Sequence, residues 1–107
     1  MSYKVEFSND AIDDLEQLQK YLKNHFGNTS DERVIERLLK VMLSLSNFPN
    51  RGRPAKLLFV YLDGYYYLHT RKNTIFYTID PIKKHVRILR IFSNHEDVLA
   101  RFINSLN

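Results

Sequence analysis

The residues best suited to chemistry lie in one short stretch, residues 86–97, which holds two arginines, a histidine and two carboxylates. The stretch begins as a β-branched strand and continues into an expected helix start. Because a helix N-terminus presents free N–H groups and a partial positive charge, this junction suits an anionic ligand such as a phosphate. An imidazole titrates near neutral pH and can move a proton to or from a ribose hydroxyl. His95 is therefore the candidate acid–base residue, and the alternative is an exposed residue of the first helical turn.

Arg90 is the second candidate catalytic residue, because it interrupts the apolar strand of residues 88–92. A guanidinium in such a strand must find a partner or face a groove. It could hold a phosphate through two parallel hydrogen bonds, and it could equally form a structural salt bridge with an acid of the first helix. Arg87 and His85 share one face of the same strand, which is either a groove or plain solvent-exposed surface.

Positive charge is concentrated in the second half of the chain. Residues 1–50 hold six basic and eight acidic side chains, whereas residues 51–107 hold ten and four, so the net charges are −2 and +6. A basic surface favours nucleic acid, an acidic protein partner, or both, and ordinary solvation is the alternative. The candidate binding residues for such a partner are Arg51, Arg53, Lys56, Arg71, Lys72 and Arg87.

Composition narrows the class of protein. The chain has 107 residues and no cysteine, so we expect a single domain, residues 1–107, without disulfides or thiolate metal sites. The four histidines lack metal-ligand spacing, and no glycine-rich phosphate loop is present, so no metal or cofactor is expected. No apolar run approaches the ~20 residues of a membrane span, and no signal peptide is visible. We therefore expect a cytoplasmic protein with no membrane partner.

The first half predicts one strand and two helices. Residues 3–7 alternate between apolar and polar, which indicates a half-buried strand. Residues 8–10 supply capping side chains for a helix whose apolar positions recur at helical spacing and which stops at Gly27. A capping box at residues 29–32 begins a second helix that ends at residues 47–50. The short link predicts an antiparallel helix pair.

The second half predicts four strands and a last helix. The strands are expected at residues 56–62, 65–70, 74–79 and 85–92, and residues 63 and 64 give a hairpin signal between the first two. Asn94 is expected to cap the last helix, with Val98, Phe102 and Leu106 on one face. The order predicts an α+β fold: an N-terminal strand, an antiparallel helix pair, a four-stranded largely antiparallel sheet and a short C-terminal helix.

Several segments in this order resemble one known family. The opening residues 3–11, the connector NFPNRGRP at residues 47–54, the strand IFYTID at residues 75–80, and ILRIF at residues 88–92 followed by Asp97 are similar to motifs of the RelE/ParE toxins of bacterial type II toxin–antitoxin pairs. The resemblance covers nearly the whole chain and implies the RelE/ParE fold. It also implies a cognate antitoxin partner, with operator DNA bound only through the antitoxin complex.

The resemblance implies one of two toxic mechanisms. One is metal-independent, ribosome-dependent cleavage of mRNA, for which some members use a histidine near the position of His95. The other is ParE-like poisoning of DNA gyrase, which is a binding activity. Where mRNA-cleaving members carry lysines, this chain has Tyr66 and Leu68, and Thr74 and Leu99 replace an arginine and a tyrosine. Ser93 replaces the histidine of the ParE-type strand.

Those departures leave three functions open. The connector and the ILRIF strand favour the gyrase mechanism, whereas His95 and the basic second half keep mRNA cleavage in consideration. The third possibility is a catalytically inert relative that acts only by binding a partner. Whether the chain is an enzyme therefore stays undecided at the level of sequence.

Overall fold

A computed structural model of the chain describes residues 2–26 and 28–106, without the side chains of Phe26 and residues 28–31. The helices and strands are β1 (Lys4–Phe7), α1 (Asn9–Phe26), α2 (Asn28–Leu43), β2 (Arg53–Pro54), β3 (Tyr65–His69), β4 (Asn73–Asp80), β5 (His85–Ser93) and α3 (Val98–Ser105). The sheet has the strand order β1-β5-β4-β3-β2, with β1 parallel to β5 and the other pairs antiparallel. The predicted α+β class and element order are confirmed.

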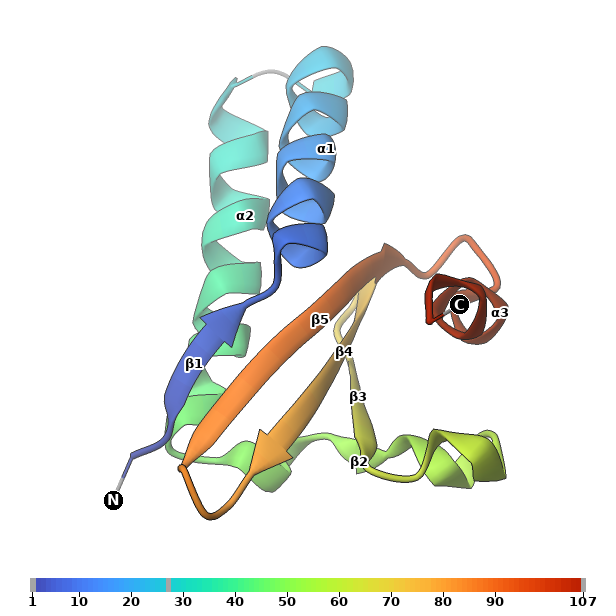
Figure 1. Cartoon of the computed structure of the whole chain (residues 1–107). Helices are drawn as coiled ribbons and strands as arrows, with labels where there is room; N and C mark the ends of the chain where they lie inside the picture. The colour runs from blue at the N-terminus through green and yellow to red at the C-terminus, as the bar shows by residue number, and fades with distance from the viewer. Residues whose placement is uncertain (1, 27, 107) are drawn as a thin grey trace.

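Two hydrophobic cores lie on opposite faces of the sheet. The helices α1 and α2 run side by side and cover one face, and α3 lies against the other (Figure 1). The helix-side core is built on Met42, Leu45, Ile75, Tyr77 and Ile88. The α3-side core contains Ala55, Leu62, Tyr67, Phe76, Phe92 and Phe102. No helix in the described part of the chain is long and apolar enough to cross a membrane.

The strand predicted at residues 56–62 is wrong. The chain there forms two 3-10 turns, Ala55–Leu57 and Val60–Leu62, and the sheet instead gains the two-residue strand β2. Pro54 has no N–H with which to extend the ladder, and the apolar run that follows has no alternation of period two. Consequently the turn at Gly64 leads from a 3-10 turn into β3, and does not join two strands.

The cap of the last helix is also corrected. Asn94 was expected there, but Asp97 is the N-cap, and its carboxylate accepts the Ala100 N–H at 3.1 Å. His95 therefore lies in the turn before α3, outside its first helical turn. The predicted stop at Gly27 and the side chains of residues 29–31 in the predicted capping box fall outside what the structure describes. The backbone of residues 29–32 belongs to α2, which begins at Asn28.

A bulge in β5 connects the sheet to α1. Leu89 has no partner on β4, because Phe76 pairs with Arg90 and Tyr77 pairs with Ile88. A bulge leaves one residue's backbone groups outside the ladder. Here the Leu89 carbonyl accepts the Ser8 hydroxyl at 2.8 Å, and the same hydroxyl oxygen caps α1 by accepting the Ala11 N–H. The expected helix cap at residues 8–10 is thus confirmed.

Asp14 of α1 fixes the strand just beyond the bulge. Its carboxylate accepts Nε and Nη2 of Arg90 at 2.9 and 3.0 Å, and the Ile91 N–H at 2.9 Å. The ion pair raises the pKa of the Arg90 guanidinium above its usual value. The salt bridge that the sequence offered as one interpretation of Arg90 is therefore present.

We expect Asp14→Ala to lower the free energy of unfolding by about 2–4 kcal/mol, because it leaves a guanidinium and a backbone N–H without their acceptor. Urea unfolding at neutral pH measures the loss. The neighbouring exposed Asp13 is a matched control, and Asp13→Ala should change stability by less than about 0.5 kcal/mol. Equal effects of the two substitutions would contradict a special role for Asp14.

Candidate functional site

Two turns meet at one end of the sheet, and we call residues 69–74 and 93–97 together the turn surface. The first joins β3 to β4, and the second leads from β5 to α3. The Asn94 N–H donates to the Lys72 carbonyl at 2.9 Å, and the Asn94 amide donates to the Thr70 carbonyl at 3.1 Å. These bonds hold two predicted binding residues, Arg71 and Lys72, beside the turn that carries His95.

A chain of side-chain hydrogen bonds runs beneath the turn surface. The buried Thr74 hydroxyl donates to Asn94 Oδ1 at 2.5 Å and lies 2.7 Å from Nδ1 of His69. Because a hydroxyl has one proton, this pattern assigns the His69 proton to Nδ1, from where it donates to Thr74. In the neutral form of the exposed His69 ring, this tautomer leaves Nε2 as a hydrogen-bond acceptor. This orientation of His69 depends on the strand register that pairs it with Thr74, so it cannot be derived from sequence alone.

His95 is exposed, and among the described residues its contact is a hydrogen bond from its backbone N–H to Ser93 Oγ at 3.3 Å. Two carboxylates follow it. Asp97 occupies the helix N-terminus as its cap, and Glu96 accepts Nη1 of Arg101 at 2.6 Å. The positive end of α3 is therefore already matched by an acid of the chain itself, which weakens the expected anion site at this junction.

The sheet face beneath α3 is filled by aromatic rings. Phe102 stacks on Phe76 with ring centroids 4.0 Å apart and an interplanar angle of 4°. Tyr65 meets Phe102 edge to face at 5.3 Å, and Phe92 meets Phe76 at 6.0 Å. The guanidinium of Arg90 lies 4.7 Å from the centroid of Phe92. This part of the sheet is consequently a packed core.

The register also changes how Tyr66 and Leu68 are interpreted. Both residues pack against the helix-side core. The β3 residues on the opposite face are Tyr65, Tyr67 and His69, because side chains alternate along a strand. A comparison of Tyr66 and Leu68 with catalytic lysines therefore says little about a groove on the α3 side.

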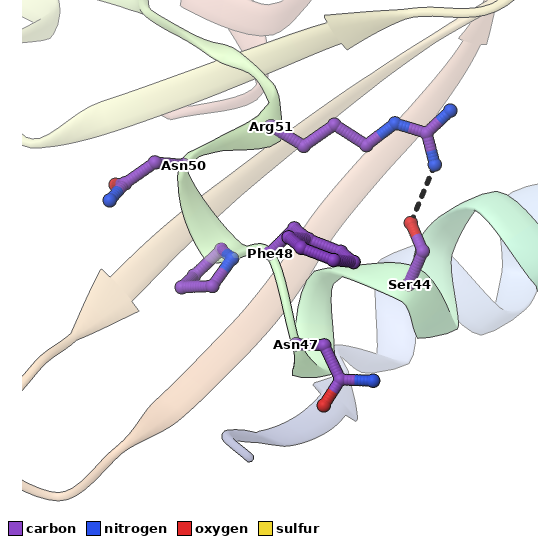
Figure 2. Close-up of a pocket in the computed structure, with 6 residues that line it drawn as sticks. Ser44, Asn47, Phe48, Asn50 and Arg51 are labelled. Atoms are coloured by element: carbon purple, nitrogen blue, oxygen red, sulfur yellow. Dashed lines mark hydrogen bonds between the residues drawn. The ribbon is translucent and has the colours of Figure 1, made fainter. Parts of the chain in front are cut away.

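The connector at residues 47–54 is held in place by hydrogen bonds with two residues outside it, Ser44 and Tyr77. Figure 2 shows Arg51 reaching back to the end of α2, where its Nη1 donates to Ser44 Oγ at 2.7 Å. Phe48 and Asn50 line an open hollow of about 670 Å³ beside this bond. Arg51 thus has a structural contact in addition to its predicted binding role.

Tyr77 is the site-forming residue that sequence reasoning missed. Its buried hydroxyl donates to the Pro49 carbonyl at 2.9 Å and accepts the Gly52 N–H at 3.0 Å. A Cβ on Gly52 would lie 2.5 Å from both that hydroxyl and the Tyr67 carbonyl, so only glycine fits. The signal was present in the sequence, because Gly52 and Tyr77 stand in two of the motifs that carry the family resemblance.

The remaining predicted binding residues do not form one groove. Arg53 lies on β2 opposite Tyr67, and Lys56 is exposed in the following 3-10 turn. Arg87 is exposed on β5, in register with Thr78 on one side and Glu6 on the other. In the described residues, no group of three His, Cys, Asp or Glu side chains gathers closely enough to hold a metal ion.

Burial raises the pKa of the Tyr77 phenol above its ordinary value of 10.0, and nearby Tyr66 acts in the same direction. The folded state therefore binds this proton more tightly than the unfolded state does. Its contribution to stability is complete below about pH 10 and is lost as the pH rises through the higher folded-state pKa. We expect Tyr77→Phe to lower stability by about 1–3 kcal/mol at pH 7 and to make the loss of stability above pH 10 shallower.

Urea unfolding between pH 7 and 11 measures both effects. The exposed phenol of Tyr61 is the control, and Tyr61→Phe should follow the wild-type curve at every pH. A Tyr77→Phe protein as stable as the wild type at pH 7 would contradict the role of this hydroxyl in holding the connector.

One comparison with known proteins identifies the family. The sequence model described as the ParE toxin of the type II toxin–antitoxin system parDE matches residues 5–98. No curated protein matches the chain by sequence.

Three similar solved structures share the fold. The toxin–antitoxin complex RelBE2 from Mycobacterium tuberculosis has a TM-score of 0.68 at 24% identity, over 88% of this chain and 100% of that one. A chromosomal ParDE system from P. aeruginosa gives 0.72 at 17%, over 86% and 96%. A RelE variant from E. coli in the free state gives 0.63 at 19%, over 100% of both chains. With the family match over residues 5–98, this chain belongs to the ParE toxin family of the type II toxin–antitoxin system parDE.

Proposed function

We propose that this protein arrests bacterial growth by binding DNA gyrase, and that a cognate antitoxin neutralises it in the cytoplasm. The observation that carries the proposal is the aromatic packing beneath α3. Phe76, Phe92 and Phe102 are each almost fully buried there. Because this face of the sheet is packed against α3, it offers no open cleft there for an RNA strand. The outer surface of the domain remains available for protein contacts.

The placement of the polar residues supports the same proposal. RNA cleavage through the 2′-hydroxyl needs a base, an acid and a charge stabiliser within hydrogen-bond reach of one phosphate. Two guanidinium nitrogens of Arg90 donate hydrogen bonds to Asp14 and are not available to a phosphate. His95 stands on an exposed turn next to Glu96, which repels a phosphate. The two predicted catalytic residues, Arg90 and His95, therefore do not converge on one reacting centre.

An exposed apolar surface is available for a protein target. Leu57, Val60 and Tyr61, which we call the apolar ridge, are 67%, 70% and 81% exposed. They lie in the 3-10 turns between β2 and β3, and this segment of the chain extends away from the helix pair (Figure 1). Clustered apolar side chains on a surface are typical of protein interfaces. We assign this ridge to the contact with gyrase.

A second candidate function is mRNA cleavage at the turn surface. The oriented His69 ring and the neighbouring cations Arg71 and Lys72 favour it, because an imidazole acceptor beside positive charge suits a phosphodiester. Operator DNA enters the proposal only through the antitoxin complex. An inert partner-binding protein is the outcome if neither toxic activity is found.

Expression of the protein alone should arrest growth and leave mRNA intact, while purified protein should inhibit supercoiling by gyrase. His95→Ala and His69→Ala should keep the full effect, because neither side chain belongs to the proposed gyrase contact. Primer extension on cellular mRNA and an agarose supercoiling assay are the measurements. Cleavage of mRNA by the wild type that is lost in either histidine variant would establish the nuclease mechanism in place of the gyrase mechanism. Normal growth at high soluble expression would leave an inert partner-binding protein as the remaining function.

The double substitution Val60→Asp and Tyr61→Ser should raise the concentration needed for half-maximal gyrase inhibition by about tenfold or more. Ile82→Asp is the control, because Ile82 is 92% exposed in the turn between β4 and β5. Both proteins should melt like the wild type. Deletion of the C-terminal residues 98–107 is a poor test of binding, because it removes Phe102 from the core. Undiminished inhibition by the double variant would remove the ridge from the interface.

A further inference from the structure

The hollow of about 670 Å³ beside the connector has no part in the proposed gyrase contact (Figure 2). We call it the connector hollow, and its lining residues are Ser44, Asn47, Phe48, Pro49, Asn50 and Arg51. We propose that it binds a single mononucleotide, with the base stacked on Phe48 and the phosphate held by Arg51. The inference goes beyond the proposed function, because it concerns a small ligand and does not depend on gyrase.

The apolar part of the connector hollow is an aromatic platform. Phe48 is 66% exposed, so its ring adds little to either hydrophobic core. A nucleobase can stack on an exposed aromatic ring because every base has a π-face. An aliphatic ligand would gain less, since it is best buried in an enclosed apolar pocket and this hollow is open to solvent. The platform therefore favours a flat ligand.

The polar part of the connector hollow holds two amides that the chain leaves unused. In the described part of the chain, the side chains of Asn47 and Asn50 make no hydrogen bond with another residue. An amide offers both a donor and an acceptor, as the edge of a nucleobase does. Figure 2 shows Asn47 beside Phe48, and Asn50 on the other side of the connector. Asn47 is thus the better placed to bond the edge of a base stacked on Phe48.

Arg51 supplies positive charge for a phosphate. Its Nη1 donates to Ser44 Oγ at 2.7 Å, but among the described residues it has no carboxylate partner. The N–H groups on Nε and Nη2 are therefore available to a phosphate, which a guanidinium binds through two parallel hydrogen bonds. No acidic side chain lines the hollow to repel that phosphate. Figure 2 shows Arg51 and the Phe48 ring both pointing toward the end of α2, so one ligand can reach both.

The backbone of the connector is held in place before any ligand binds. The Phe48 N–H donates to the Ser44 carbonyl at 3.0 Å, and the Arg51 N–H donates to the Phe48 carbonyl at 3.0 Å. The Gly52 N–H donates to the buried Tyr77 hydroxyl at 3.0 Å. Because these bonds fix the backbone around Phe48, a ligand has to order only exposed side chains. Such preorganisation reduces the entropy lost on binding.

The size of the connector hollow favours a mononucleotide over a nucleic acid strand. Sites for small ligands usually enclose about 300–1,000 Å³, and this one lies within that range. Its lining contains one aromatic ring and one guanidinium, which match one base and one phosphate. A strand is usually bound by several aromatic side chains along a basic groove, whereas this lining comes from one short segment, residues 44–51.

The test titrates adenosine 5′-monophosphate into the full-length protein and follows the backbone amide signals by NMR. We expect saturable shifts in residues 44–51, with a Kd of about 0.1–1 mM because the hollow is open. Adenosine, which lacks the phosphate, and ribose 5-phosphate, which lacks the base, should each bind at least about tenfold more weakly. Absence of saturable shifts up to about 10 mM nucleotide, or shifts centred on the turn surface, would overturn the proposal.

Variants assign the two contacts. Phe48→Ala and Arg51→Ala should each raise the Kd by about tenfold. Tyr21→Ala and Arg53→Ala are the matched controls, because they remove an exposed aromatic ring and an exposed guanidinium elsewhere, and they should leave the Kd within about twofold of wild type. Ser44→Ala breaks the bond to Arg51 but keeps the guanidinium, so it should raise the Kd by less than about threefold. Wild-type affinity in Phe48→Ala, or equal weakening by the controls, would contradict the site.

Two further measurements distinguish other occupants of the connector hollow. A single-stranded adenylate hexamer that binds more than about 100-fold tighter than the mononucleotide, with a strong salt dependence, would make the hollow part of a strand-binding surface and overturn the single-ligand assignment. Loss of gyrase inhibition in Phe48→Ala, without nucleotide binding by the wild type, would place the ring in a protein interface instead. Nucleotide binding by a protein that does not inhibit gyrase would support this proposal and overturn only the proposed function.

Discussion

The structure depends on a single inserted residue, the bulge at Leu89 in β5. Without it, strict alternation would place residue 90 on the helix side after Ile88. With it, Ile88 and Ile91 both reach the helix-side core, while Leu89 and Phe92 contribute to the α3-side core. The bulge therefore places Ile91 in the helix-side core and Phe92 in the α3-side core, because it shifts the phase of β5 at the point where β1 ends and α1 begins.

The bulge also explains the bonding of α1. The Leu89 carbonyl lies outside the ladder and accepts a hydrogen bond from the Ser8 hydroxyl. The Ile91 N–H and the Arg90 guanidinium donate hydrogen bonds to the Asp14 carboxylate. An arginine in an apolar strand is therefore accommodated by a paired carboxylate on a neighbouring helix. Because the Arg90 guanidinium is paired with Asp14, it is not a free phosphate ligand. The outer surfaces of the protein are then the better candidates for binding a partner.

Sequence periodicity predicted the elements wherever one face of a strand or helix is buried. The alternation in residues 3–7 and 85–92 and the apolar spacing of α1 and α2 were sufficient for the class and order. The strand prediction for residues 56–62 was wrong because a continuous apolar run does not show which side chains face the core. Only the tertiary structure distinguishes buried Leu62 from exposed Val60. The cap of the last helix was predicted wrongly because Asn94 and Asp97 are both residue types that cap helices well. In the structure, Asn94 Oδ1 instead accepts a hydrogen bond from the Thr74 hydroxyl. Arg71 and Lys72 were identified from their type, but their place beside the turn that carries His95 required the fold.

The position of β5 has a consequence for synthesis. It is the next-to-last element of the chain, yet it lies between β1 and β4 in the sheet, and β1 pairs only with it. During translation the first strand and the acceptor Asp14 must wait for residues 85–93 to leave the ribosome, since contacts of such long sequence separation close last. A message that is truncated before that point yields a fragment with no sheet partner for β1 and with neither core complete. The fold with both cores complete thus forms only after residues 85–93 have been made, which makes the late strand a checkpoint on the product of an interrupted translation.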